Sequence, residues 1–160
     1  MKSSSTILLR ITILLIGAPI VVAGIFWIPG FGGILEGMDQ GMAFLKYPFF
    51  IGIYAAGIPF FFALYQSFKL LKFIDQNIAF SELSVKALWN IKYCAMAISG
   101  LYALELPILY FMAQEDDAPG LLLLGIVIVF ASVVIAAFAA VLHKLLKDAI
   151  DIKSENDLTV

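Results

Sequence analysis

The chain has 160 residues, of which 62% are hydrophobic and 14% are charged, and its mean hydropathy is +1.02. Soluble domains carry about one quarter charged residues, so this composition excludes a soluble fold and predicts an integral membrane protein. The net charge of −2 gives no reason to expect nucleic-acid binding, and the one cysteine, Cys94, excludes an internal disulfide and a multi-cysteine metal site.

The first predicted membrane span covers residues 6–29. Cleavage as a signal peptide is an alternative, because Lys2 supplies a basic start and residues 21–23, Val-Val-Ala, resemble a cleavage site. The apolar run continues well past Ala23, which favours a retained span. The glycine-rich stretch 29–33 predicts the end of the helix and the start of the first outer loop.

The second predicted span covers residues 47–70, and the basic segment Lys-Leu-Leu-Lys at 69–72 marks its cytoplasmic end. A turn is expected after this segment. Ser81 is predicted to be the N-cap of the following helix, since a serine hydroxyl can accept a hydrogen bond from a free amide group of the first turn. The third predicted span covers residues 89–112.

The fourth predicted span, residues 119–142, has the clearest pattern, because no charged residue lies between Ala118 and Leu142. This run is longer than the roughly 20 apolar residues that cross a hydrocarbon core of about 30 Å as a helix. Acidic residues precede it and basic residues follow it: Glu115, Asp116 and Asp117 before, and His143, Lys144 and Lys147 after.

The distribution of basic residues predicts how the spans are oriented. Lys46 is predicted outside, and nine basic residues lie at predicted cytoplasmic ends, so both termini are expected in the cytoplasm. Short connections imply antiparallel neighbours. The predicted fold class is therefore an all-α integral membrane protein, with four transmembrane helices in an up-down-up-down bundle and a cytoplasmic helical extension and tail at 143–160. The nine residues are Lys2, Arg10, Lys69, Lys72, Lys86, Lys92, Lys144, Lys147 and Lys153.

Two stretches resemble a known family. They are the cytoplasmic connection at residues 73–88, which includes Phe-Ser-Glu-Leu-Ser-Val-Lys-Ala-Leu, and the ending Glu-Asn-Asp-Leu-Thr-Val at 155–160. Both are similar to the YoaS-like family of small bacterial membrane proteins, catalogued as domain of unknown function 2975, and the resemblance covers essentially the whole chain. Members of that family are typically encoded beside a small helix-turn-helix regulator of the Cro/CI type. The resemblance therefore implies a membrane protein that works with a transcription factor, and it supplies no catalytic residue.

The sequence lacks the residue combinations that enzymes use. His143 is the only histidine, and no metal-binding motif, nucleophile motif or phosphate-binding glycine loop is present. We therefore expect no catalytic activity, no metal and no cofactor. His143 is expected where the fourth helix leaves the membrane, and either this interfacial position or a proton-sensing role accounts for it.

Glu105 is an ionisable residue predicted well inside a span, where such a side chain costs roughly 2.5–3.5 kcal/mol near the helix centre. In a structural interpretation, protonated Glu105 hydrogen-bonds to Tyr54, at similar depth in the second span, or to the carbonyl of Ala103, which Pro107 leaves without its helical donor. In a functional interpretation, Glu105, Tyr54 and Pro107 mark a ligand or cation site in the outer half of the bundle.

Beyond the fourth span an apolar stripe continues for about 15 Å. Its expected partner within the protein is the end of the second helix, residues 69–74. After Lys153 the chain is predicted to leave the helix and end as an extended segment, which either frays or binds a cytoplasmic partner at a sheet edge or in a groove. The stripe consists of Leu142, Leu145, Leu146, Ala149 and Ile150, and the candidate partner surface of Ser154, Glu155, Asn156, Asp157, Leu158, Thr159 and Val160.

Two functions are compatible with these features. The first is a membrane regulatory or adaptor protein that engages a cytoplasmic partner, for which the resemblance suggests a Cro/CI-type helix-turn-helix regulator, without direct binding of nucleic acid. The alternative is a small-solute or ion transporter or channel subunit that uses Glu105. The alternative requires a homo-oligomer, because four helices with short loops enclose little room for a polar path.

Overall fold

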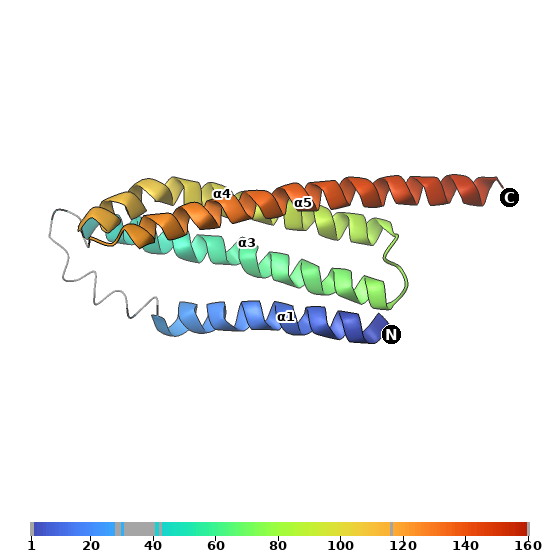
Figure 1. Cartoon of the computed structure of the whole chain (residues 1–160), viewed down its shortest axis with the longest axis horizontal. Coiled ribbons are helices and arrows are strands. Elements are labelled where there is room, and N and C mark those ends of the chain that lie inside the picture. The colour runs from blue at the N-terminus through green and yellow to red at the C-terminus, as the bar shows by residue number, and fades with distance from the viewer. Residues whose placement is uncertain (1, 28–29, 31–40, 42, 116, 160) are drawn as a thin grey trace.

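The computed structural model describes residues 2–27, 30, 41, 43–115 and 117–159, and the described residues are mostly helical (Figure 1). No strand occurs among them. The helices are α1 (Lys2–Val22), a short π-helix η1 (Ala23–Trp27) that continues it, α3 (Ala43–Asp75), α4 (Glu82–Glu115) and α5 (Pro119–Leu158).

Four helical segments are long and apolar enough to cross a membrane. The prediction of an all-helical protein with four segments of this kind is therefore confirmed. The glycine-rich stretch predicted to start the outer loop lies, apart from Gly30, outside the described residues. The four segments are Ser4–Phe26, Phe44–Asp75, Glu82–Glu115 and Pro119–Leu158.

The end of α3 is formed by a local backbone motif centred on Asn77. This residue has a φ of 59°, in the left-handed region that asparagine tolerates better than most residues. The amide of Ile78 donates to the carbonyl of Phe73 at 2.9 Å, and the amide of Asn77 donates to that of Ile74 at 3.1 Å. These two bonds are those of a Schellman motif, which satisfies the free carbonyls of the last helical turn.

The connection from α4 to α5 repeats this motif with Asp117, whose φ is 49°. The amide of Ala118 donates to the carbonyl of Ala113 at 2.9 Å. This bond, between residues five apart in the sequence, is the 6→1 hydrogen bond of a Schellman motif. Pro119 then opens α5, at a position where the missing amide hydrogen is not needed. The reversal of the chain is therefore encoded locally.

Ser81 lies at the start of α4, as predicted, but its hydroxyl does not cap the helix in the predicted way. The backbone carbonyl of Ser81 accepts hydrogen bonds from the amides of Ser84 at 3.1 Å and Val85 at 3.2 Å. Its hydroxyl instead donates to the carbonyl of Ile78 at 2.6 Å. The side chain thus fixes the preceding turn, because the αL geometry at Asn77 brings that carbonyl within reach.

The helices are arranged as an open row. Central helix α4 packs extensively against α5 and α3, and α1 packs against α3 at the edge. Successive helices run in opposite directions along the long axis, and the N-terminus lies at the same end as the end of α5, which projects beyond the other helices (Figure 1). Among the described residues no extensive contact joins α5 back to α1, so the arrangement is more open than a compact bundle. Lipid tails are as apolar as the helix surfaces, so no hydrophobic force closes the row.

Small side chains form the contact between α4 and α5. The buried residues of α5 are Gly125, Ser132, Ala136 and Ala139. A side chain at Gly125 would place its Cβ 2.5 Å from Cδ1 of Leu109 on α4. Small residues allow the two backbones to approach closely, which is how membrane helices gain van der Waals contact.

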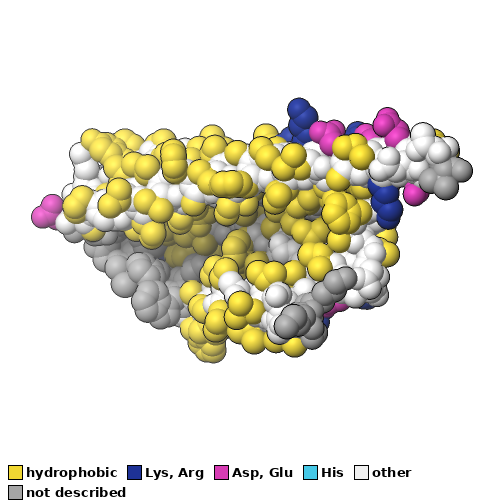
Figure 2. All heavy atoms as spheres, turned by 45° about the vertical axis from the view of Figure 1, so that its right-hand side comes forward, with side chains coloured by type: hydrophobic (Ala, Val, Ile, Leu, Met, Phe, Trp, Pro, Cys, Tyr) yellow, Lys and Arg dark blue, Asp and Glu magenta, His cyan; other side chains and the backbone are white. Residues whose placement is uncertain are grey.

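Hydrophobic side chains cover most of the molecular face in Figure 2. Lysine, arginine, aspartate and glutamate side chains gather mainly at one end, over the projecting part of α5, which we call the charged end. A broad apolar surface with charges at an end is the distribution that a bilayer requires of a spanning protein.

Candidate functional site

Glu105 lies on α4, the central helix, and only 5% of it is exposed. Both of its carboxyl oxygens are buried and have no hydrogen-bond partner. Within the described part of the chain, no other buried side-chain oxygen or nitrogen lacks a partner. Burying a polar group in this way is unfavourable, which makes Glu105 the most unusual polar group of the membrane-spanning region.

A glycine on α3 provides the space that Glu105 occupies. A Cβ atom at Gly52 would overlap Oε1 of Glu105 and lie 2.5 Å from its Cδ and 3.0 Å from its Cγ. The carboxyl group therefore rests directly on the α3 backbone. Sequence reasoning missed Gly52, because a single glycine in an apolar span gives no sign of which neighbouring side chain it receives.

Tyr54 does not form the predicted hydrogen bond with Glu105. Its hydroxyl donates to the carbonyl of Gly24 in η1 at 3.3 Å. Tyr54 lies two residues after Gly52, which turns it by roughly 200° around α3, so it faces α1 instead of α4.

Pro107 lies inside α4, which continues through it. Its side chain is exposed, whereas Glu105, two residues earlier, is buried. The expected hydrogen bond from Glu105 to the carbonyl of Ala103 is also not formed, since neither carboxyl oxygen has a partner. The structure therefore places Glu105, Tyr54 and Pro107 in three different surroundings and does not bring them together as one site.

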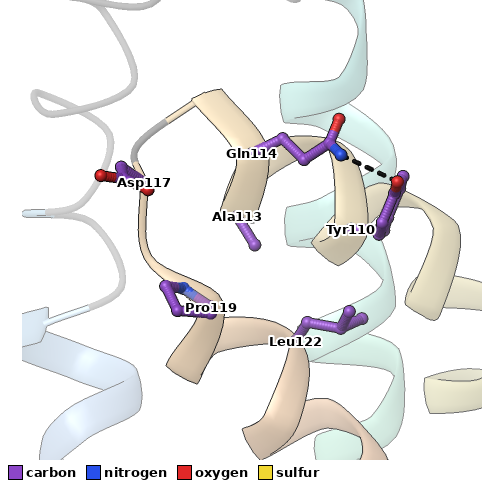
Figure 3. Close-up of a pocket in the computed structure, with 6 residues that line it drawn as sticks. All are labelled: Tyr110, Ala113, Gln114, Asp117, Pro119 and Leu122. Carbon is purple, nitrogen blue, oxygen red and sulfur yellow. Dashed lines mark hydrogen bonds between the residues drawn. The ribbon is translucent and has the colours of Figure 1, made fainter.

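A pocket of about 510 Å³ lies at the connection between α4 and α5 (Figure 3). The amide of Gln114 is turned towards Tyr110 and donates to its hydroxyl oxygen at 2.8 Å, whereas the carboxylate of Asp117 points away from both. Sequence reasoning missed this pocket because the turn at Asp117 creates it. Its lining residues are Tyr110, Ala113, Gln114, Asp117, Pro119 and Leu122, and Glu105 is not among them.

An aromatic and basic cluster joins α4 to α5 near the charged end. The ring centroid of Trp89 lies 5.2 Å from that of His143 and 4.9 Å from that of Tyr93. Nζ of Lys92 lies 5.2 Å and 5.7 Å from the Trp89 and Tyr93 rings. Amphipathic rings and lysines are typical of the membrane–water interface, so an interfacial position for His143 stays a prediction.

The described residues contain no group of three or more histidine, cysteine, aspartate or glutamate side chains that could hold a metal ion.

The predicted tail conformation is wrong, because α5 remains helical to Leu158. The hydroxyl of Thr159 donates to the carbonyls of Glu155 and Asn156, both at 3.0 Å, and so satisfies groups at the helix end. No glycine or proline occurs after Gly125 to interrupt the helix. Ser154 to Leu158 are therefore exposed positions on a helix, and Val160 lies outside the described residues.

The apolar stripe beyond the fourth span divides into two faces. Leu146 and Ile150 are half-buried, whereas Leu142 and Leu145 are 52% and 59% exposed. The predicted partner for the stripe was the end of α3, residues 69–74, but α5 packs extensively against α4 and not against α3. The order of helices in the row accounts for the difference, because α4 lies between them.

Comparison with known proteins gives two matches. The family described as "Protein of unknown function (DUF2975)" matches residues 31–160. The chain is also 58% identical to the "Uncharacterized membrane protein YoaS" of Bacillus subtilis (strain 168), over 160 residues that cover all of both chains. No solved structure matches the chain. The resemblance found in the connection at 73–88 and in the last six residues is confirmed.

Proposed function

The chain belongs to the DUF2975 family of membrane proteins of unknown function, and from that premise we propose that it is a small regulatory or adaptor protein of the bacterial plasma membrane. Its four helices cross the membrane up-down-up-down with both termini in the cytoplasm. It engages a cytoplasmic partner and has no catalytic step.

The observation that supports this proposal best is the length of α5. The apolar run ends at Leu142, yet the helix continues to Leu158, which adds about 24 Å at 1.5 Å per residue. Every residue from Asp151 to Thr159 is exposed. The exposed residues 151–159 do not pack within this chain, so their surface is available to a partner outside it.

The position of the basic residues supports a cytoplasmic location for this projecting helix, since Lys144, Lys147 and Lys153 lie on it. Labelling of intact cells with a membrane-impermeant thiol reagent tests the orientation, using chains in which Cys94 is replaced by serine. Asp116→Cys should be labelled and Asn77→Cys should be spared. The reverse pattern would place the helix outside and remove its access to a cytoplasmic regulator.

The helical tail favours a particular mode of binding. An exposed helix with Leu158, 84% exposed, near its end can lie in a groove of the partner, whereas joining a sheet edge would require an extended strand. The partner that we propose is a Cro/CI-type helix-turn-helix regulator, in agreement with the family resemblance.

Capture of that regulator by the tagged, detergent-solubilised protein tests the proposal. Truncation after Lys153 should abolish capture and leave membrane insertion unchanged, because residues 154–159 are exposed and lie beyond the apolar span. Ser154→Pro should weaken capture by breaking the helix, and Ser154→Ala should not. Full capture by the truncated chain would overturn the assignment of the tail.

Glu105 supports a second candidate function, that of an oligomeric transporter or channel subunit for a small solute or ion. A buried acidic side chain without a partner is the feature that favours it. Against it stands the close contact with Gly52, which leaves no room beside the carboxyl group. A Glu105→Gln protein that folds normally but no longer moves solute across vesicle membranes would support transport, and an unchanged cellular phenotype would exclude it.

A further inference from the structure

The cytoplasmic part of α5 carries two apolar stripes that face different directions. The first contains His143, Leu146 and Ile150, which are half-buried. It continues the buried positions Ser132, Ala136 and Ala139 at alternating steps of four and three residues and therefore faces α4.

The second stripe is exposed except at Ala149. Leu142, Leu145 and Ile152 are 52%, 59% and 60% exposed, and the half-buried Ala149 lies between them. The same steps of three and four residues extend it back to Ile135 and Phe138, which are 53% and 66% exposed. From Ile135 to Ile152 the apolar spacing of three and four residues covers about two and a half heptads, and alternation of three and four is the pattern of a coiled-coil seam.

We propose that this second stripe is the seam of a parallel two-stranded coiled coil between α5 helices of two copies of this chain. The a positions are Ile135, Leu142, Ala149 and Asn156, and the d positions are Phe138, Leu145 and Ile152, since the helix ends at Leu158. The inference goes beyond the proposed function and does not depend on it.

A second copy of the chain fits this stripe because the charges beside the seam are complementary to those of the same seam in another copy. In this register Asp148 occupies a g position and Lys153 the following e position. In a parallel dimer these two positions face each other across the interface, so Asp148 of each copy meets Lys153 of the other, twice per dimer. Both residues are exposed in the single chain.

Asn156 gives a second reason for two strands. An asparagine at an a position lowers the stability of a coiled coil but selects a single register and a two-stranded state, because its amide finds a partner only in its counterpart. The stripe is apolar from Ile135 to Ile152, and Asn156 is the next a position. Pairing of the two Asn156 side chains would therefore set the register of the dimer.

Anchoring in the membrane allows two helices to pair through such a short seam. Isolated helices of this length are marginal in water. Two copies anchored in one bilayer with the same orientation hold their α5 helices parallel and at high effective concentration. Leu158 and Ser154 lie away from the seam, so a cytoplasmic partner can still reach them.

Disulfide cross-linking in native membranes tests the seam, using the full chain with Cys94 replaced by serine. Ile152→Cys is at a d position, whereas Ser154→Cys, two residues further, is at an outward f position and serves as the matched control. Under mild oxidation we expect about ten times more covalent dimer from the first variant, since facing d positions come within disulfide distance. Equal cross-linking of both variants, or none, would overturn the proposal, and so would cross-linking of Ile152→Cys to a different protein.

Charge reversal then tests the pairing. In the Ile152→Cys chain, Asp148→Lys alone or Lys153→Asp alone places like charges opposite each other and should lower the yield of dimer about threefold. The two changes together recreate the pair with opposite sign and should restore the yield. A double variant that dimerises no better than the single variants would contradict the assigned register.

Discussion

The central helix α4 and the edge helix α1 are both apolar, yet they are held in different ways. Glu105 on α4 rests on Gly52 of α3, and Leu109 on α4 rests on Gly125 of α5. Apolar residues of α1 are largely exposed, with Leu8 at 66% and Leu15 at 68%.

A few separate contacts attach α1 to α3. Arg10 and Asp75 form an ion pair at 2.6 Å, and Tyr54 donates to the carbonyl of Gly24. Gly17 provides a close approach, since a Cβ there would lie 3.1 Å from Cδ1 of Leu64. In a bilayer, hydrophobicity alone does not bring helices together, so the difference in small-residue packing makes α4 the centre of stability and α1 the helix that separates most readily.

Among the substitutions that test this difference between α4 and α1, a larger side chain at Gly52 should cause the largest change in stability. Gly52→Val would force the side chain of Glu105 away from α3 and should lower the free energy of unfolding by about 3 kcal/mol, the upper part of the range for overpacked sites. Denaturation by SDS in mixed micelles measures it. Gly57→Val is the matched control on the same helix, because nothing lies within 4 Å of a Cβ at Gly57. Glu105→Ala in the Gly52→Val chain should recover part of the loss, and equal stability of the two valine variants would show that α3 does not rest on Glu105.

Replacing Glu105 by an apolar side chain of similar length should stabilise the packing of α4 against α3. Glu105→Met removes two buried oxygens without partners and should raise the free energy of unfolding by about 1–3 kcal/mol. Thermal unfolding in detergent measures the change. Glu115→Met, at an exposed position on the same helix, should have no effect. A loss of stability in Glu105→Met would mean that the carboxyl group has a stabilising partner in the membrane.

Removing the hydroxyl of Tyr54 should loosen only the edge helix. Tyr54→Phe loses the hydrogen bond to Gly24, and hydrogen bonds between membrane helices contribute about 0.6 kcal/mol on average. Hydrogen exchange followed by mass spectrometry should show faster exchange in η1 and no change in α4. Tyr47→Phe, at a tyrosine that is 73% exposed, is the control. Faster exchange in α4 as well would argue that the centre and the edge open together.

The ion pair between Arg10 and Asp75 should contribute least. Its side chains are 41% and 29% exposed, and an exposed pair contributes less than about 1 kcal/mol, which salt reduces further. A double-mutant cycle with Arg10→Ala and Asp75→Ala, measured at low and high salt, gives the coupling energy. A coupling that exceeds the effect of Tyr54→Phe and persists in high salt would require a more buried pair than the structure describes.

Some features of the site followed from individual residues. Glu105 could be predicted to lie inside a span because it interrupts an apolar run, and it is buried within α4. Its contact with Gly52 could not be predicted, because helices that are apolar nearly all round carry no pattern that sets their rotation against each other. The end of α5 was missed for a different reason, since Ser-Glu-Asn-Asp has modest helix propensity but here prolongs an existing helix that Thr159 closes.

By itself the sequence determined how many apolar segments the chain has and roughly where they lie, because hydropathy is a property of each segment. It also determined the turns before and after α4, because turn residues such as Asn77 and Asp117 act over a few residues. Only the tertiary structure decided the order of the helices in the row, the seat of Glu105 on Gly52, the partner of Tyr54 and the division of the stripe on α5 into a buried and an exposed face. The physical reason is that these features depend on which small residue of one helix meets which side chain of another, and that contact joins residues far apart in the chain.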